Sequence, residues 1–99
     1  MKLIISDVAE FEIEDIWYYI VNNFGVKVAI DKMQKFYKDL YKLVDNPYMG
    51  KSVDGHDENL RQFYCAPNMV IYDINDEVIE ILHVVDARTD YARLVRCPI

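Results

Sequence analysis

The sequence predicts an α+β fold of β-α-α-β-β-β order, in which a helical hairpin packs on a small, mainly antiparallel sheet. Three observations indicate this class. One short β-rich run comes first, and two segments with apolar residues at helical spacing follow it before position 46. After position 59 there are three further β-rich runs, separated by turn-forming residues. Because 99 residues are the usual size of one domain, residues 1–99 are expected to form a single domain.

The first elements are a strand over residues 2–5 and a helix from Asp7 to about Asn23. Asp7 and Glu10 have the spacing of a capping box, which marks a helix start. The predicted buried stripe of this helix consists of Ala9, Ile13, Ile16 and Ile20. A solvated acidic face, suited to the positive end of the helix dipole, is expected from Asp7, Glu10, Glu12, Glu14 and Asp15.

A second helix is predicted after the break at Gly25, ending at Asp45-Asn46-Pro47. The apolar residues at helical spacing, which predict its buried face, are Val26, Ile30, Met33, Tyr37, Leu40 and Val44. Lysines occupy the opposite face, and Asp31 and Asp39 are placed to pair with Lys35 from either side. A basic helix beside an acidic one favours a self-complementary helical hairpin, with docking of an acidic partner helix as the alternative.

Three strands are predicted at residues 60–65, 69–74 and 78–85, joined by turns at Pro67-Asn68 and Asn75-Asp76. Such short connections require antiparallel pairing. The last strand is apolar on nearly both sides, which is typical of a central strand, and its His83 is expected to be structural. Residues 47–58 are predicted to be a loop, and its acidic residues and His56 are not expected to bind a metal.

Composition restricts the classes of function. A formal charge of −6 disfavours direct binding of free nucleic acid, which depends on neutralising phosphates. The short apolar N-terminus predicts a cytoplasmic protein without a membrane span, and no pattern calls for a cofactor or metal. Cys65 and Cys97 are expected to be reduced, packed thiols.

All four arginines lie in the second half of the chain. Their planar forks suit carboxylates and phosphates, so this half is the candidate recognition surface. Arginines at ordinary solvated strand ends would give the same pattern.

Over nearly its whole length, the chain resembles the RelE/ParE toxin superfamily. The motifs that carry the resemblance are Ala9, Asp15-Ile16 and Tyr19-Ile20; Asn46-Pro47-x-x-Gly50; Leu60-Arg61; Val70-Ile71-Tyr72-Asp73-Ile74; and Val78-Ile79-x-Ile81-x-x-Val84-Val85-Asp86-x-Arg88-x-Asp90-Tyr91. The resemblance implies the toxin half of a bacterial type II toxin–antitoxin pair, neutralised by a small antitoxin. One branch of the superfamily cuts mRNA in the ribosomal A site, and the ParE-like branch inhibits DNA gyrase.

The nuclease branch would assign Arg61, Arg88 and Tyr91 to catalysis. Cleavage at the 2′-OH needs a base, a cationic phosphate cradle and an acid. The lysines that this branch places before the second strand are largely missing here, since only Lys51 precedes it, in an acidic loop. A ribosome-dependent mRNA endonuclease therefore stays an alternative.

The ParE-like branch commonly reads Leu-His-Gly-Arg-Arg-Asp where this chain has residues 85–90, with Asp86 and Thr89 as departures. Arg88 would contact a carboxylate of a target or antitoxin, or would pair internally with Asp86 or Asp90. We therefore predict a toxin that inhibits DNA gyrase by binding, without catalysis of its own. A degenerate, non-toxic member that only binds an antitoxin is a further alternative. The predicted contact residues are Arg61, Asp86, Arg88, Asp90, Tyr91 and Arg93.

Overall fold

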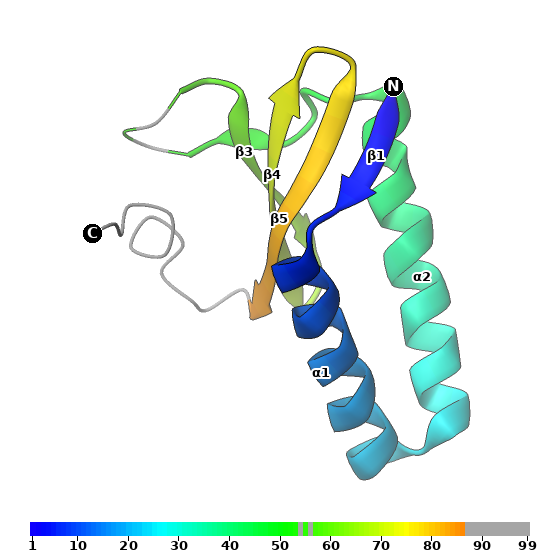
Figure 1. Cartoon of the computed structure of the whole chain (residues 1–99). Coiled ribbons are helices and arrows are strands. Elements are labelled where there is room, and N and C mark those ends of the chain that lie inside the picture. The colour runs from blue at the N-terminus through cyan, green and yellow to red at the C-terminus, as the bar shows by residue number, and fades with distance from the viewer. Residues whose placement is uncertain (54, 56, 87–99) are drawn as a thin grey trace.

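The computed structural model describes residues 1–53, 55 and 57–86. Its elements are β1 (Lys2–Ile5), α1 (Asp7–Phe24), α2 (Val26–Asp45), β2 (Lys51–Ser52), β3 (Leu60–Cys65), β4 (Asn68–Asn75) and β5 (Val78–Asp86). The two helices form a hairpin beside the twisted sheet (Figure 1). This arrangement confirms the predicted α+β class and element order.

The sheet has five strands in the order β1-β5-β4-β3-β2. β1 pairs parallel with β5, and the other neighbours pair antiparallel. The predicted central position of the last strand is confirmed, because β5 lies between β1 and β4. The prediction of a pure loop over residues 47–58 is wrong at β2, whose Lys51 and Ser52 pair with Gln62 and Arg61.

Both predicted turns are wrong by one residue. Asn68 pairs with Asp86 and Asn75 pairs with Val78, so both asparagines belong to strands. The connections are therefore residues 66–67 and 76–77. Asp76 has a φ of 56°, a left-handed conformation that aspartate tolerates better than most residues.

Ser6, and not Asp7, caps α1. The Ser6 hydroxyl oxygen accepts a hydrogen bond from the Ala9 amide at 3.1 Å. The predicted stripe is confirmed: Ala9 and Ile13 are buried, and Ile16 and Ile20 pack against the core.

The prediction of a solvated acidic face is wrong at Glu12. Its carboxylate accepts a hydrogen bond from the Val84 amide of β5 at 2.9 Å. A helix wheel does not show that a strand edge lies within reach of this position.

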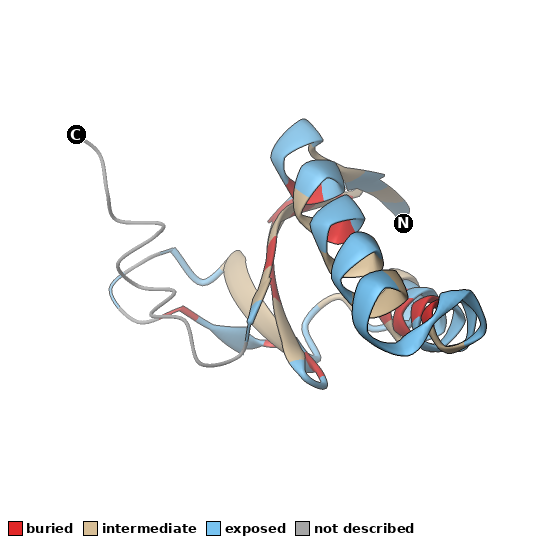
Figure 2. Ribbon diagram, turned by 90° about the horizontal axis from the view of Figure 1, so that it is seen from below, coloured by how far each residue is buried: buried red, intermediate tan, exposed pale blue. Residues whose placement is uncertain are grey.

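The predicted buried face of α2 is partly wrong. Residues that face the core are Ala29, Met33, Phe36, Leu40 and Leu43. Val26, Ile30 and Tyr37 belong to the predicted stripe but are 53%, 43% and 37% exposed. The helix carries two neighbouring apolar stripes, and the sheet covers only one. Figure 2 shows the buried positions turned toward the sheet and exposed ones along the outer sides of the helices.

The core lies between the helical hairpin and the sheet. Its largest fully buried side chains include Tyr72, Leu40, Ile79 and Ile81. On the surface of α2, Asp39 forms the predicted ion pair with Lys35 at 2.9 Å and another with Lys42 at 3.1 Å. Within the described part of the chain, neither helix has the length and apolar character needed to cross a membrane.

Candidate functional site

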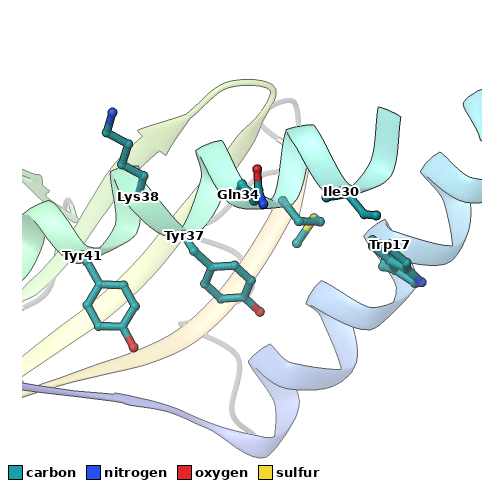
Figure 3. A pocket seen from close by; sticks show the side chains of 7 residues that line it. Trp17, Ile30, Gln34, Tyr37, Lys38 and Tyr41 are labelled. Atoms are coloured by element: carbon teal, nitrogen blue, oxygen red, sulfur yellow. The ribbon is translucent and has the colours of Figure 1, made fainter. Parts of the chain in front are cut away.

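A shallow apolar groove of about 610 Å³ follows the side of α2 that faces α1. Its lining residues are Trp17 from α1 and Ile30, Met33, Gln34, Tyr37, Lys38 and Tyr41 from α2. In Figure 3 the rings of Tyr37 and Tyr41 extend from α2 toward the space beside α1. We call these seven residues the hairpin groove.

Aromatic side chains dominate the hairpin groove. Tyr41 is 54% exposed, and Tyr37 packs edge-on against buried Phe36 with 5.5 Å between ring centroids. Burial, followed by the charges of Glu10 and Tyr41, raises the pKa of Tyr37. Its hydroxyl therefore stays protonated at neutral pH and can donate or accept a hydrogen bond at the end of a large apolar ring.

The chemistry of this groove suits the apolar face of a peptide helix. Exposed apolar side chains that lie together mark interaction surfaces, and tyrosine and tryptophan are common anchors in such surfaces. Lys38 lines the groove and can pair with an acidic residue on the polar side of the occupant.

A second cluster forms where the loop after α2 meets β3 and β4. We call it the loop junction and define it by Pro47, Tyr48, Gly50, Arg61 and Tyr72. The fully buried Tyr72 hydroxyl donates to the Pro47 carbonyl at 2.7 Å and accepts from the Gly50 amide at 3.1 Å. Burial raises the pKa of Tyr72, against smaller opposing effects of Gly50 and Arg61, so the hydroxyl keeps the proton that it donates.

Arg61 closes the loop junction from β3. Its Nη1 donates to the Gly50 carbonyl at 2.6 Å and lies 3.4 Å from the Tyr48 carbonyl. The guanidinium carbon stands 4.8 Å from the centroid of the Tyr48 ring, within cation–π range. One terminal nitrogen of the guanidinium is thus bound to the protein's own backbone, whereas the buried Nε of Arg61 has no hydrogen-bond partner among the described residues.

The six predicted contact residues do not all meet in the described structure. Arg61 pairs with Tyr72, whereas exposed Asp86 pairs with Asn68 at the opposite end of β4. Arg88, Asp90, Tyr91 and Arg93 lie outside the described residues. Sequence patterns missed the hairpin groove, although the spacing of Ile30, Tyr37 and Tyr41 along one side of α2 is a signal for it.

The cysteines and the acidic and histidine side chains of the described residues do not form a further catalytic or metal-binding cluster. Cys65 is buried, as predicted, and burial raises the pKa of its thiol to about 11. Cys97 lies outside the described residues. In residues 1–53, 55 and 57–86, no group of three or more His, Cys, Asp or Glu side chains could hold a metal ion.

Comparisons with known proteins agree on one family. The profile of the family described as "ParE toxin of type II toxin-antitoxin system, parDE" matches residues 3–91. Toxin ParE1 of Caulobacter vibrioides is 32% identical over 81 residues, covering 76% of this chain and 80% of that toxin. Toxin ParE3 of the same organism is 27% identical over 81 residues, covering 82% and 81% of the two chains.

Two solved structures share the fold. The chromosomal ParDE TA system from P. aeruginosa matches with a TM-score of 0.75 and 17% identity, covering 87% of this chain and 95% of that chain. The conserved protein HP0894 from Helicobacter pylori matches with a TM-score of 0.52 and 12% identity, covering 89% and 96%. These likenesses confirm the RelE/ParE-like architecture that the sequence motifs indicate.

Proposed function

Because the chain belongs to the ParE toxin family of type II toxin–antitoxin systems, we propose that its hairpin groove binds an antitoxin helix and that its target is DNA gyrase. The toxin would inhibit gyrase by binding and would act in the cytoplasm, where gyrase works. The observation that supports an antitoxin helix as the partner is the aromatic lining of the groove, in which Tyr37 and Tyr41 are exposed.

The chemistry of the hairpin groove defines the antitoxin segment that would fit it. Trp17, Tyr37 and Tyr41 favour an amphipathic helix with large apolar side chains on one face. Lys38, the cationic side chain among the lining residues, favours an acidic residue on the flank of that segment. An acidic antitoxin helix is thus the occupant that we propose.

The loop junction favours binding over RNA cleavage. A nuclease of this fold would direct an arginine from the second predicted strand at a phosphate. Nη1 of Arg61 instead donates to the Gly50 carbonyl at 2.6 Å and lies 3.4 Å from the Tyr48 carbonyl. With a formal charge of −6 and Lys51 as the one lysine of its loop, the chain offers a poor phosphate cradle. This supports a protein target.

A supercoiling assay tests the target. Purified toxin added to DNA gyrase and relaxed plasmid should stop supercoiling, and prior mixing with the cognate antitoxin, sought as the product of a neighbouring short reading frame, should restore it. Residues Arg88 to Arg93 would make the contacts, so Arg88→Ala should weaken inhibition about tenfold, as expected for one lost charge-assisted contact. Normal supercoiling at excess toxin would remove gyrase as the target.

Induced expression in a bacterial host separates the alternatives. Gyrase inhibition predicts filamentous cells with intact mRNA. Transcripts cut within codons would instead support the ribosome-dependent endonuclease, and normal growth would support a non-toxic member that only binds an antitoxin.

A further inference from the structure

Glu12 of α1 bridges the helical hairpin to the last strand. Its Oε1 accepts a hydrogen bond from the Val84 amide at 2.9 Å, and its Oε2 lies 3.3 Å from Nδ1 of His83. The carboxylate and the imidazole are both about one quarter exposed, so the contact is partly shielded from water. This is the one acidic side chain of the predicted solvated face for which the structure gives a contact with β5.

The contact between Glu12 and β5 lies where the pairing of β5 with β1 ends and α1 begins to contact β5. β1 pairs with β5 as far as Ile5 and Ile81, and the chain then turns into α1. The Ser6 hydroxyl donates to the Leu82 carbonyl at 3.2 Å, directly after that point. α1 begins beside the C-terminal half of β5 (Figure 1), and there Ser6 and Glu12 bind backbone groups of β5 beyond the end of its pairing with β1.

The same stretch of β5 has an irregular register. Ile71 pairs with His83 and Tyr72 pairs with Ile81, so Leu82 is an extra residue in β5. A bulge of this kind bends its strand and changes the direction in which the strand leaves the sheet. Glu12 holds the two residues that follow the bulge, His83 and Val84, and Asp86 ends the strand two residues later.

We propose that Glu12 is a positioning residue that fixes the direction in which β5 ends at Asp86, the first residue of the segment that we predict to contact the target. The effect on target binding rests on the proposed function, whereas the contacts of Glu12 with β5 do not depend on it. The hairpin groove lies on the side of α2 that faces α1, and Glu12 is not among its lining residues. Loss of Glu12 should therefore impair toxicity and leave antitoxin binding intact.

Three variants of the full chain test the proposal. Glu12→Ala removes the acceptor for the Val84 amide. Glu12→Gln keeps a carbonyl oxygen at the same reach, so it should restore the contact without the charge. Glu14→Ala removes one acidic residue from an exposed position of the same helix and is the matched control.

Amide hydrogen exchange tests the geometry. Glu12→Ala should accelerate exchange of the Val84 amide at least about tenfold, the effect of losing one hydrogen bond to a charged acceptor. Exchange at Val70, the partner of Val84 on β4, should stay unchanged. Protection of Val84 that survives in Glu12→Ala would overturn the bridge.

Two measurements test whether loss of Glu12 impairs toxicity but not antitoxin binding. They are growth arrest on induced expression and affinity for the antitoxin, and both apply whichever target the toxin inhibits. Glu12→Ala should need about tenfold more toxin for the same arrest, with antitoxin affinity within about twofold of the unmodified chain. Glu14→Ala should behave as the unmodified chain, and Glu12→Gln, whose neutral oxygen is a weaker acceptor, should fall between the unmodified chain and Glu12→Ala. Equal losses of toxicity and antitoxin affinity, or full toxicity of Glu12→Ala, would overturn the proposal. A normal supercoiling result together with this pattern of arrest would reject gyrase and keep the positioning role.

Discussion

The hairpin groove and the loop junction lie along the same helix and its exit loop, but they use their aromatic residues in opposite ways. At the loop junction, the Tyr72 hydroxyl is fully buried and bonded on both sides. In the hairpin groove, Tyr41 leaves more than half of its surface in water, and Tyr37 is held by one neighbouring ring. The junction satisfies its own polar groups, whereas the groove leaves apolar surface uncovered.

The family motifs of the loop junction stabilise the fold, whereas the hairpin groove offers a surface for a partner. Three of the family motifs contribute to one internal hydrogen-bond network. These motifs are Asn46-Pro47-x-x-Gly50, Leu60-Arg61 and the strand segment that contains Tyr72. They hold the exit of α2 against β3 and β4. A family motif can therefore hold the fold together, while the groove that suits a partner has no motif of its own.

Gly50→Ala should be the most damaging change at the loop junction. A Cβ there would lie 2.5 Å from the Tyr72 hydroxyl oxygen and 2.7 Å from the Gln62 carbonyl oxygen. Neither buried Tyr72 nor a paired strand backbone can move freely, so the free energy of unfolding should fall by about 3 kcal/mol. Urea denaturation measures this loss. The exposed neighbour Ser52→Ala should change it by no more than about 0.5 kcal/mol, and equal effects would contradict the close fit.

Tyr41→Ser should give the opposite pattern in the hairpin groove. Its ring is largely exposed, so the free energy of unfolding should fall by no more than about 1 kcal/mol. Antitoxin binding should weaken by about 2 kcal/mol, roughly 30-fold, as for an aromatic anchor at an interface. Calorimetric titration measures the affinity.

Tyr64→Ser is the matched control for this prediction, because Tyr64 is 57% exposed but lies on β3, away from the groove. It should leave the affinity within about twofold, since surface tyrosines outside an interface contribute little to binding. An antitoxin that loses as much affinity for Tyr64→Ser as for Tyr41→Ser would place the interface elsewhere.

Sequence patterns predicted the elements well because local rules determine them. Apolar spacing located both helices, and β-rich runs located three of the strands within a residue or two. The errors arose where tertiary contacts choose between local options. α2 has apolar residues on two neighbouring stripes, and the hairpin geometry decided that Phe36 and Leu43 would be buried while Ile30 and Tyr37 stayed exposed.

The same limit applies to the candidate site. Arg61 was predicted to contact a target or antitoxin, and its sequence neighbours do not show that the carbonyls of Tyr48 and Gly50 would be its partners within the chain. Glu12 looked like one more solvated acid, because the strand edge that it reaches is over seventy positions away in the chain. Contacts of such long range are set by the fold and leave no periodic signal.

Arg61→Lys is the smallest of these changes and tests the junction most directly. Lysine keeps the positive charge but lacks the planar fork that spans the Gly50 carbonyl and the Tyr48 ring, so the free energy of unfolding should fall by about 1 kcal/mol. If the side chain serves only to hold the loop, toxicity on induced expression should be unchanged at temperatures well below the unfolding midpoint. If Arg61→Lys keeps its stability and loses its toxicity, the arginine contacts a target after all, and the nuclease alternative regains its first catalytic residue.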